Sequence, residues 1–600
     1  QTAYEAGLFP EFMEQRAPGH TALDGKIYRQ GMLDFKKQIE ENIGTLDYRH
    51  DPEATDKAEQ WKAMAISCDA VILFAERHAD LAEEMARTEP DPGRAAELRK
   101  IAAVCRRVPA HRPETFWEAI QMYWFVHLGT ITELNGWDAM NPGHFDQHLS
   151  PFYEKELAAG TLTRDEAKEL LCCFWIKVNN HPAPPKVGIT ARESGTYNDF
   201  TNINIGGVTG DGSDGTSDVS YLMLEVIEEL HILQPGSSVH ISAKTPDDFL
   251  HAAARVIRRG HGYPSIFNPD IYIREMVRQG KSLADAREGG CSGCIEVGAF
   301  GKEAFLLTGY LNVPKILEVT LNNGIDPLTG GKVGIETGTP LDFTTFDQLY
   351  EAFIAQLRYV VDQKIRVSNY IDRMFAKYAP APFLSVVIED CISKGRDYYD
   401  GGPRYNTSYI QCCGLGTVTD SLAAIKKHVL EEGRYSMDEL LAAVSRNFEG
   451  EEIMRQTIMN RTPFFGNDDD FADDIGVRVY DDLDAAIDGN PNIKEGGRYH
   501  LNMLSTTCHA YFGTVLGATP NGRLAGKAIS DGTSPSHGAD SNGPSAVVKS
   551  LSKLDQVKSG GTLLNQRFLP SLLKRDEDIR KLGHLVRTYF TLGGHHIQFN

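Results

Sequence analysis

The segment Gly289-Gly290-Cys291-Ser292-Gly293-Cys294-Ile295-Glu296-Val297-Gly298 decides how the rest of this chain is interpreted. Its four glycines permit sharp turns and close backbone approach that other residues resist. Because alternate side chains of an extended segment point the same way, Cys294 and Glu296 are expected to project into the same space. A tight loop that presents a thiol and a carboxyl group together predicts a reaction centre. Two alternatives stand beside it: a buried structural thiol, or a CxxC half-site formed by Cys291 and Cys294.

The other cysteines bear on these alternatives. The chain has ten cysteines scattered over 600 residues, including the adjacent pairs Cys172-Cys173 and Cys412-Cys413. This pattern is unlike a secreted disulfide framework and is typical of a reducing cytoplasm. No second CxxC motif or ordered Cys/His cluster accompanies Cys291 and Cys294 in the sequence, so no metal site is predicted.

Composition narrows the class of protein. Apolar residues make up 41% of the chain, enough for a sizeable core, and 61 basic against 82 acidic residues give a formal charge of -21. This negative charge argues against nucleic acid or an anionic membrane surface as a partner. The sequence contains no long uninterrupted apolar run and no secretory signal, and it begins at Gln1, so we expect a trimmed N-terminus and a cytoplasmic protein.

The first part of the chain, to about residue 190, is expected to be helical. Residues 113–128 are apolar almost all round, with Pro near the start, which is typical of a buried helix. A capping box at residues 163–166 predicts the start of another helix. Cys172 and Cys173 lie inside its apolar run, and core packing is the expected role of both.

From about residue 196 strands and helices alternate. Strands are predicted at 199–208, 237–242 and 383–388, the last as a continuous apolar strand buried on both faces. Helices are predicted from capping and turn signals at 245–260, 282–288, 314–323 and from 436 onward. This alternation favours an α/β fold with a covered sheet or barrel, organised as one large catalytic domain with a helical N-terminal portion.

Several other clusters of polar or charged residues are weaker candidates for a functional site. The acidic run 467–474 lacks the glycine and terminal glutamate of a calcium loop, so a solvated turn or helix start is favoured, as it is for 211–218. His595-His596 is interpreted as a packed or hydrogen-bonded pair rather than a ligand pair. Residues 520–523 and 534–538 are turn-rich; phosphate binding is one alternative there, and irregular loops around a barrel are favoured.

Long motifs point to one family. The segment 292–327, SGCIEVGAFGKEAFLLTGYLNVPKILEVTLNNGIDP, resembles the cysteine loop of the pyruvate formate-lyase-like glycyl radical enzymes. GNDDDFADD, GATPNGR, SDGTSPSHGAD, GGTLLN and the final GGHHIQFN are also similar to that family. The resemblance covers essentially the whole chain. It makes Cys294 and Glu296 the expected catalytic residues and leaves Cys291 as scaffold.

The resemblance carries expectations about fold and partners. It implies a ten-stranded α/β barrel built from two half-barrels and surrounded by helices, with the cysteine loop at the barrel centre. It also implies a homodimer, an anaerobic bacterial host, and a separate activating enzyme that uses S-adenosylmethionine and an iron–sulfur cluster. No bound cofactor is expected; a glycyl radical is installed after translation. The radical glycine belongs to an RVAGY-like motif that should follow GGHHIQFN, so we expect the glycine radical domain beyond Asn600.

Within the family, several segments resemble the members that remove water from trans-4-hydroxy-L-proline to give 1-pyrroline-5-carboxylate. The substrate-binding residues that this resemblance implies are Phe12, His20, Asp138, Ser194, Asp199, Phe200, Tyr310 and Thr506, with Thr507 as an alternative to Thr506. Asp138 is expected to pair with the ring ammonium, and Ser194 with the Phe200 N–H to hold the carboxylate. Tyr310 and His20 would contact the hydroxyl side, and Phe12 the ring.

The expected mechanism is radical dehydration. A thiyl radical on Cys294 would remove a hydrogen from the carbon next to nitrogen, and Glu296, with a pKa raised by burial, would exchange a proton with the departing hydroxyl. Other family chemistry stays an alternative: arylacetate decarboxylation, C–S cleavage, diol dehydration, or dehydration of another hydroxyproline isomer. An inactive paralogue that acts as a partner subunit is the alternative from a different class.

Overall fold

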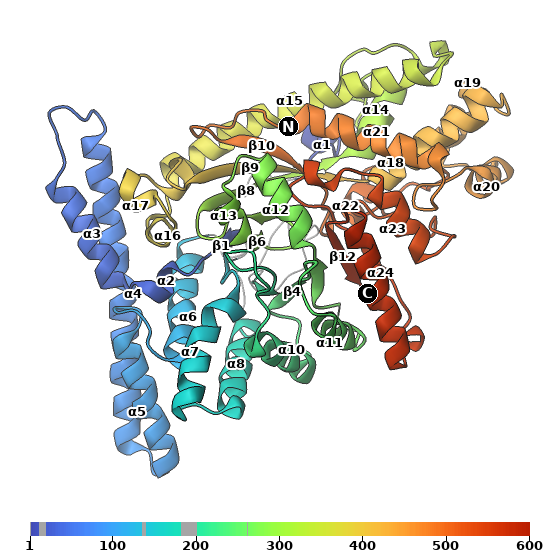
Figure 1. Cartoon of the computed structure of the whole chain (residues 1–600). Coiled ribbons are helices and arrows are strands. Elements are labelled where there is room, and N and C mark those ends of the chain that lie inside the picture. The colour runs from blue at the N-terminus through green and yellow to red at the C-terminus, as the bar shows by residue number, and fades with distance from the viewer. Residues whose placement is uncertain (1, 11–19, 135–139, 182–200, 261) are drawn as a thin grey trace.

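The strands of the protein gather in the middle of the molecule and helices surround them (Figure 1). The computed structural model describes residues 2–10, 20–134, 140–181, 201–260 and 262–600. Among these residues most hydrophobic side chains belong to one continuous core, and a smaller second cluster packs around the Gly289–Gly298 segment. The mixed α/β class expected from the sequence is confirmed.

The first part of the chain supplies mainly helices. Two short parallel strands, β1 and β2, pair Thr21 with Met140 and Ala22 with Asn141, which brings the residues before α2 beside those after α6. Threonine capping boxes start α6 and α8, because the hydroxyl of Thr115 or Thr163 accepts from the N–H three residues on. The elements are α1 (Thr2–Glu5), β1 (Thr21–Ala22), α2 (Lys26–Arg29), α3 (Met32–Gly44), α4 (Ala54–Thr88), α5 (Pro92–Arg107), α6 (Phe116–Glu133), β2 (Met140–Asn141), α7 (Phe145–Ala159) and α8 (Arg164–Asn179).

One prediction about α8 is wrong. Cys173 is exposed, although it was expected in the core, whereas Cys172 is half-buried and packs against the core as expected. The 3.6-residue period of the helix explains the difference, since the buried positions Leu171, Phe174 and Trp175 form the core-facing stripe and Cys173 lies on the opposite side.

A five-stranded sheet follows, with the order β11-β12-β5-β4-β3. β3, β4 and β5 run parallel, β12 is antiparallel to β5, and β11 is parallel to β12. The C-terminal residues therefore add two strands to a sheet built from the middle of the chain. The elements are β3 (Asn202–Gly206), α10 (Asp218–Leu230), β4 (Gly236–His240), α11 (Asp247–Ile257), β5 (Ser265–Phe267), α12 (Pro269–Arg278), α13 (Leu283–Arg287), β11 (Asn565–Gln566), α24 (Asp576–Thr591) and β12 (His596–Phe599).

A second sheet has three parallel strands in the order β10-β9-β8. All ten residues of β8 are buried, as expected for a parallel strand covered on both faces. The register of β8 against β9 shifts between Leu307 and Tyr310, which is a bulge, and beyond it Tyr310 pairs with Gln411. The elements are β8 (Glu303–Asn312), α14 (Val313–Leu321), α15 (Phe346–Tyr378), β9 (Tyr405–Cys413), α18 (Leu415–Ile425), α19 (Met437–Ser445), α20 (Glu452–Arg461), α21 (Asp470–Ile487), β10 (Arg498–Asn502), α22 (Cys508–Thr514) and α23 (Pro544–Ser552).

The strand predicted at 383–388 is wrong, because this segment is the short helix α16 (Pro382–Val387), followed by α17 (Cys391–Lys394). A short apolar run fits a buried helix and a buried strand equally well. The tertiary structure favours the helix, since the Glu133 carboxylate accepts hydrogen bonds from the N–H groups of Phe383 and Leu384 at 2.8 and 2.9 Å. The other predicted strands and helices lie where expected within the described residues.

Candidate active site around Cys294 and Glu296

The Gly289–Gly298 segment is a narrow hairpin. β6 (Gly290–Cys291) pairs antiparallel with β7 (Val297–Gly298), and the five residues between them form a bent loop. The Ser292 N–H and hydroxyl both donate to the Glu296 carbonyl, at 2.7 and 3.0 Å, and close this loop. Gly293 is required at the tip, because a Cβ there would collide with the His20 ring. Cys294 and Glu296 are thus brought together by a bend rather than by the extended segment that the sequence suggested.

Side chains of the five-stranded sheet anchor the Cys291 side of the loop. The Asn204 amide donates to the Cys291 carbonyl at 2.8 Å and accepts from the Cys291 N–H at 3.1 Å. His240 fixes the Asn204 side chain, with 2.6 Å between Nε2 and Oδ1. From α7's N-terminal side, His144 Nε2 lies 3.0 Å from the Gly289 carbonyl. Burial lowers the pKa of both His144 and His240, so they act as neutral hydrogen-bonding groups.

Cys291 is part of this scaffold. Its thiol accepts a hydrogen bond from the Asn202 amide at 3.4 Å and lies 3.4 Å from the Cys294 carbonyl oxygen. The residue is completely buried, and burial raises the pKa of its thiol. No group of three or more His, Cys, Asp and Glu side chains within the described residues could hold a metal ion, so the structure offers Cys291 no ligand set there.

Glu296 has an asymmetric set of partners. Its Oε2 accepts from the backbone N–H groups of Cys294 and Ile295, each at 3.2 Å, and lies 3.1 Å from His20 Nδ1. Among the described residues its Oε1 has a single contact, at 3.4 Å, with the Gln411 amide nitrogen. Both Glu296 and Gln411 are completely buried, whereas Cys294 keeps part of its surface accessible. Within the part of the chain that the structure describes, Oε2 is therefore held firmly, whereas Oε1 has only one long hydrogen bond.

The expected rise in the pKa of Glu296 is wrong in direction. Burial does favour the neutral acid, but the nearby His20 and the backbone N–H donors together outweigh it and lower the pKa of Glu296. The opposite holds for Cys294, where burial and the Glu296 charge raise the pKa of the thiol well above its ordinary value. The site therefore combines an ionised carboxylate with a neutral thiol.

Tyr310 and Thr506 lie together on another side of the site, next to Cys294. Tyr310 lies on β8 just after the bulge, and its hydroxyl is 2.7 Å from Thr506 Oγ1. Thr506 has φ = +47°, a conformation that a β-branched residue adopts only under strain. A hydrogen bond from Thr506 to the Cys294 side chain partly opposes the rise of the Cys294 pKa. Thr507, the alternative to Thr506, instead precedes α22 at its N-cap.

The structure thus assembles five of the predicted residues, namely Cys294, Glu296, His20, Tyr310 and Thr506. The other predicted residues lie outside the described part of the chain: Phe12, Asp138, Ser194, Asp199 and Phe200.

Two residues of the site, Gln411 and Asn204, were not predicted from the sequence. Both are polar residues on strands whose neighbours are buried, at positions where the pleat turns them toward the loop. Asn204 lay within a predicted strand, so the amide in DFTNINIGGV was a usable signal. No strand was predicted at Tyr405–Cys413, and nothing in the sequence connects Gln411 with a glutamate 115 positions away.

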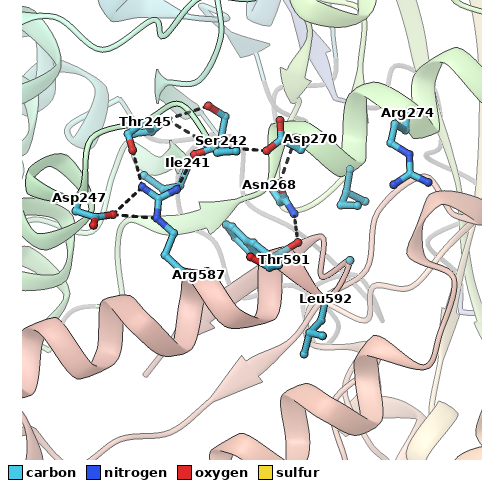
Figure 2. Close-up of a pocket in the computed structure, with 14 residues that line it drawn as sticks. Ile241, Ser242, Thr245, Asp247, Asn268, Asp270, Arg274, Arg587, Thr591 and Leu592 are labelled. Atoms are coloured by element: carbon cyan, nitrogen blue, oxygen red, sulfur yellow. Dashed lines mark hydrogen bonds and ion pairs between the residues drawn. The ribbon is translucent and has the colours of Figure 1, made fainter.

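A cavity of about 990 Å³ opens elsewhere, beside the carboxyl ends of β4 and β5 (Figure 2). Arg587 of α24 crosses it and donates to the Ser242 and Thr245 carbonyls at 2.6 and 2.5 Å and to Asp247 at 3.1 Å. Neither Cys294 nor Glu296 lines this cavity. The Arg587 guanidinium already binds these acceptors of the protein, and the two predicted catalytic residues lie elsewhere. This cavity is therefore not the reactive centre.

Two family matches span most of the chain. Residues 1–513 match the family described as Pyruvate formate lyase-like, and residues 529–600 match the family described as Glycine radical. The chain belongs to the pyruvate formate lyase-like glycyl radical enzymes. This confirms the family recognised in the sequence, and the glycine radical match indicates a radical installed after translation.

Individual relatives narrow the comparison. The chain is 52% identical over 598 residues to trans-4-hydroxy-L-proline dehydratase of Clostridioides difficile, covering 100% of this chain and 76% of that protein. It superposes with a TM-score of 0.98 on the crystal structure of hydroxyproline dehydratase from Clostridioides difficile with trans-4-hydroxy-L-proline bound, again at 52% identity and with coverage of 100% and 76%. The glycerol-bound B12-independent glycerol dehydratase of Clostridium butyricum gives 0.96 at 35% identity, with the same coverage.

A more distant relative is isethionate sulfite-lyase of Desulfovibrio desulfuricans, 33% identical over 96% of this chain and 70% of that protein. Among the described residues, no helix combines the length and apolar character needed to cross a bilayer.

Proposed function

We propose that this protein is a glycyl radical dehydratase that removes water from trans-4-hydroxy-L-proline and forms 1-pyrroline-5-carboxylate. The observation that carries the proposal is the 52% identity over the full chain to the Clostridioides difficile dehydratase, together with the Cys294–Glu296 geometry. The identity to isethionate sulfite-lyase is lower, at 33%, which favours dehydration over C–S cleavage.

Cys294 is the hydrogen-atom carrier of the proposed reaction. The glycyl radical supplies the one-electron oxidation that turns the Cys294 thiol into a thiyl radical. A thiyl radical forms by loss of a hydrogen atom, so the sulfur must be protonated beforehand; the raised pKa of Cys294 meets this need. The thiyl radical takes a hydrogen atom from the ring carbon next to nitrogen, and the re-formed S–H returns one to the ring after water has left. Exclusion of bulk water protects the radical between these steps.

His20 and Glu296 manage the proton of the leaving hydroxyl. A hydroxyl leaves far more readily as water, so one proton must reach its oxygen as the carbon–oxygen bond breaks. With 3.1 Å between His20 Nδ1 and Glu296 Oε2, the pair can share a proton, and Glu296 Oε1 is the oxygen available to the substrate. Since the lowered pKa leaves Glu296 ionised at neutral pH, the proton that it passes to the hydroxyl is supplied through His20.

The remaining contacts fit the charges of the substrate. Asp138 pairs with the ring ammonium, Ser194 and the Phe200 N–H bind the carboxylate, and Asp199 belongs to the same segment. Tyr310 and His20 contact the hydroxyl side, Phe12 packs against the ring, and Thr506 completes the wall beside Cys294. The hydrogen bonds of Tyr310 and Thr506 support this arrangement.

The proposed barrel architecture, oligomeric state and activating partner are those expected for the family. The five-stranded and three-stranded sheets would be arcs of a ten-stranded barrel made of two half-barrels, with the cysteine loop inside it. The chain would be one large catalytic domain with a helical N-terminal portion, and the protein a homodimer in the cytoplasm of an anaerobic bacterium. A radical S-adenosylmethionine enzyme would install the radical, as the glycine radical match supports.

The proposal is tested with the full-length protein, activated anaerobically by its activating enzyme. Trans-4-hydroxy-L-proline is offered beside its cis isomer, glycerol, isethionate and an arylacetate, and products are followed by mass spectrometry. Loss of one water from the trans isomer, with little reaction of the others, is expected. Consumption of another substrate with none of the hydroxyproline would refute the assignment.

A further inference from the structure

Gln411 occupies a position that the reaction described so far does not use. It lies on β9, completely buried, and its amide nitrogen is the only hydrogen-bonding contact of Glu296 Oε1 among the described residues. The other carboxylate oxygen has three contacts. Gln411 therefore faces the oxygen through which Glu296 would exchange a proton with the substrate.

The strand register makes this placement a consequence of the fold. After the β8 bulge, Tyr310 pairs with Gln411, and Gln411 pairs in turn with Asn502 on β10. Residues paired in register across a sheet project from the same face. Tyr310 and Gln411 thus stand side by side over the cysteine loop, and the bulge between Leu307 and Tyr310 sets which β8 residue takes this position.

The carbonyl oxygen of the Gln411 amide is buried and accepts no hydrogen bond within the described part of the chain. Buried polar atoms in native proteins usually have a partner, and an orphaned acceptor indicates a missing ligand or water. The donor end of the same amide is on Glu296, so the amide has one end on the proton-exchanging carboxylate and the other end free.

A neutral amide suits a carboxylate that gains and loses a proton. When Glu296 is ionised, the amide nitrogen donates to Oε1; when Oε1 carries a proton, a rotated amide can accept from it. A second carboxylate or a cation at position 411 would instead favour one charge state over the other.

We propose that Gln411 is a positioning residue for the dehydration, which holds Glu296 Oε1 through its amide nitrogen and accepts the O–H of the departing water through its carbonyl oxygen. This inference rests on the proposed function. It assigns the leaving water a defined place between Gln411 and Glu296. In this arrangement the proton is transferred to an oxygen that is already oriented, and no charge is added to the site.

The first test is kinetic, on the activated full-length protein. Gln411→Met keeps the size of the side chain and removes both hydrogen-bonding groups. We expect kcat to fall about 10- to 100-fold, as for the loss of one oriented hydrogen-bonding group, with less than about a threefold change in KM. The glycyl radical content, measured by electron paramagnetic resonance, should stay at the wild-type level.

Gln356→Met is the matched control. Gln356 is also a completely buried glutamine, but it binds the Ile335 backbone and lies outside the site. It should lower the midpoint of unfolding without lowering kcat. Gln411→Glu retains an acceptor, loses the donor and adds a second carboxylate, and should be at least as impaired as Gln411→Met. Wild-type kcat in Gln411→Met or Gln411→Glu would overturn the proposal.

The second test does not depend on the substrate. In a high-resolution crystal structure of the full-length protein without activation, a water should lie within hydrogen-bonding distance of both Gln411 Oε1 and Glu296 Oε1, and it should be absent from Gln411→Met. An amide turned away from Glu296, or no water at that place, would overturn the inference. If hydroxyproline is not consumed but this water is present, the proposed substrate fails and the Gln411 site stands.

Discussion

The five-stranded and the three-stranded sheet make different hydrogen-bonding contacts with the Gly289–Gly298 loop. On the five-stranded sheet, Asn202, Asn204 and His240 face the Cys291 side of the loop, and each polar atom of their side chains has a hydrogen-bond partner. On the three-stranded sheet, Gln411 and Asn502 face the Glu296 side, and the carbonyl oxygens of both amides have no partner among the described residues. We call the first the anchoring sheet and the second the open sheet.

The two kinds of hydrogen-bonding arrangement have different consequences for protein stability and for ligand binding. A saturated network fixes its atoms and leaves nothing to bind a ligand. Unpartnered polar groups are unfavourable in the free protein, and a substrate can satisfy them. We therefore expect substitutions on the anchoring sheet to change stability first, and those facing the open sheet to change turnover first.

The largest expected effect separates the two cysteines of the loop. Cys294→Ala should lower turnover by about 10⁴-fold or more, because no other group can carry the hydrogen atom. Cys291→Ala should retain most turnover and lose about 1–2 kcal/mol of stability through the loss of a packed sulfur. Product formation and the midpoint of thermal unfolding are measured for both. Comparable turnover in the two variants would remove the distinction.

Glu296→Gln should lower kcat by about 10²- to 10⁴-fold, the range for loss of a general acid–base group. Its size and its contact with Gln411 are retained, so binding of hydroxyproline to the unactivated protein should change little. Steady-state kinetics and calorimetric titration supply the two measurements. A large loss of affinity with unchanged kcat would make Glu296 a binding residue only.

Asn204→Leu tests the anchoring sheet. The substitution leaves the N–H and carbonyl of Cys291 buried without the amide that binds them, at a cost of about 2–4 kcal/mol. Chemical denaturation of the unactivated protein should show this loss, and Asn204→Asp, which retains an acceptor for the N–H, should lose less. Unchanged stability in Asn204→Leu would mean that the loop is held elsewhere.

The acid side of the stability profile should depend on Glu296. Its pKa in the folded protein lies below the ordinary value of 4.5, so its ionised form contributes stability above that value, and this contribution is lost as the pH falls through the folded pKa. Between pH 5 and 3 the wild type should therefore lose more stability than Glu296→Gln, when the midpoints of unfolding are compared. A parallel decline of both proteins would contradict the lowered pKa.

The smallest expected effect concerns Thr506. Glycine at this position relieves the strain of φ = +47°, but it also removes the hydroxyl bonded to Tyr310 and raises the entropy of the unfolded chain. Strain relief contributes about 1 kcal/mol, and the two opposing losses about 1 kcal/mol each, so Thr506→Gly should lower the stability by only about 1 kcal/mol. Thr506→Ser, which keeps both hydroxyl and strain, is the control. A clear stabilisation by glycine would show that the hydroxyl contributes little.

Sequence determined the local features of this protein. Capping boxes at Thr115, Thr163 and Ser436 start helices because the hydroxyl and the glutamate that follows three residues later bond to each other's backbone N–H. The glycines and the Cys294–Glu296 spacing identified the reactive loop for the same reason: the groups that interact are neighbours in the chain. The long family motifs then supplied the class of enzyme, which the family matches confirm.

Features that depend on contacts between distant segments were decided only by the tertiary structure. Residues 382–387 form a helix because Glu133 caps it, and the pKa of Glu296 falls because His20 lies beside it. Gln411 faces the carboxylate because β9 is paired between β8 and β10, and the bulge in β8 places Tyr310 beside it. Each of these effects is an interaction across more than 100 positions, and local propensity contains no information about such a distance.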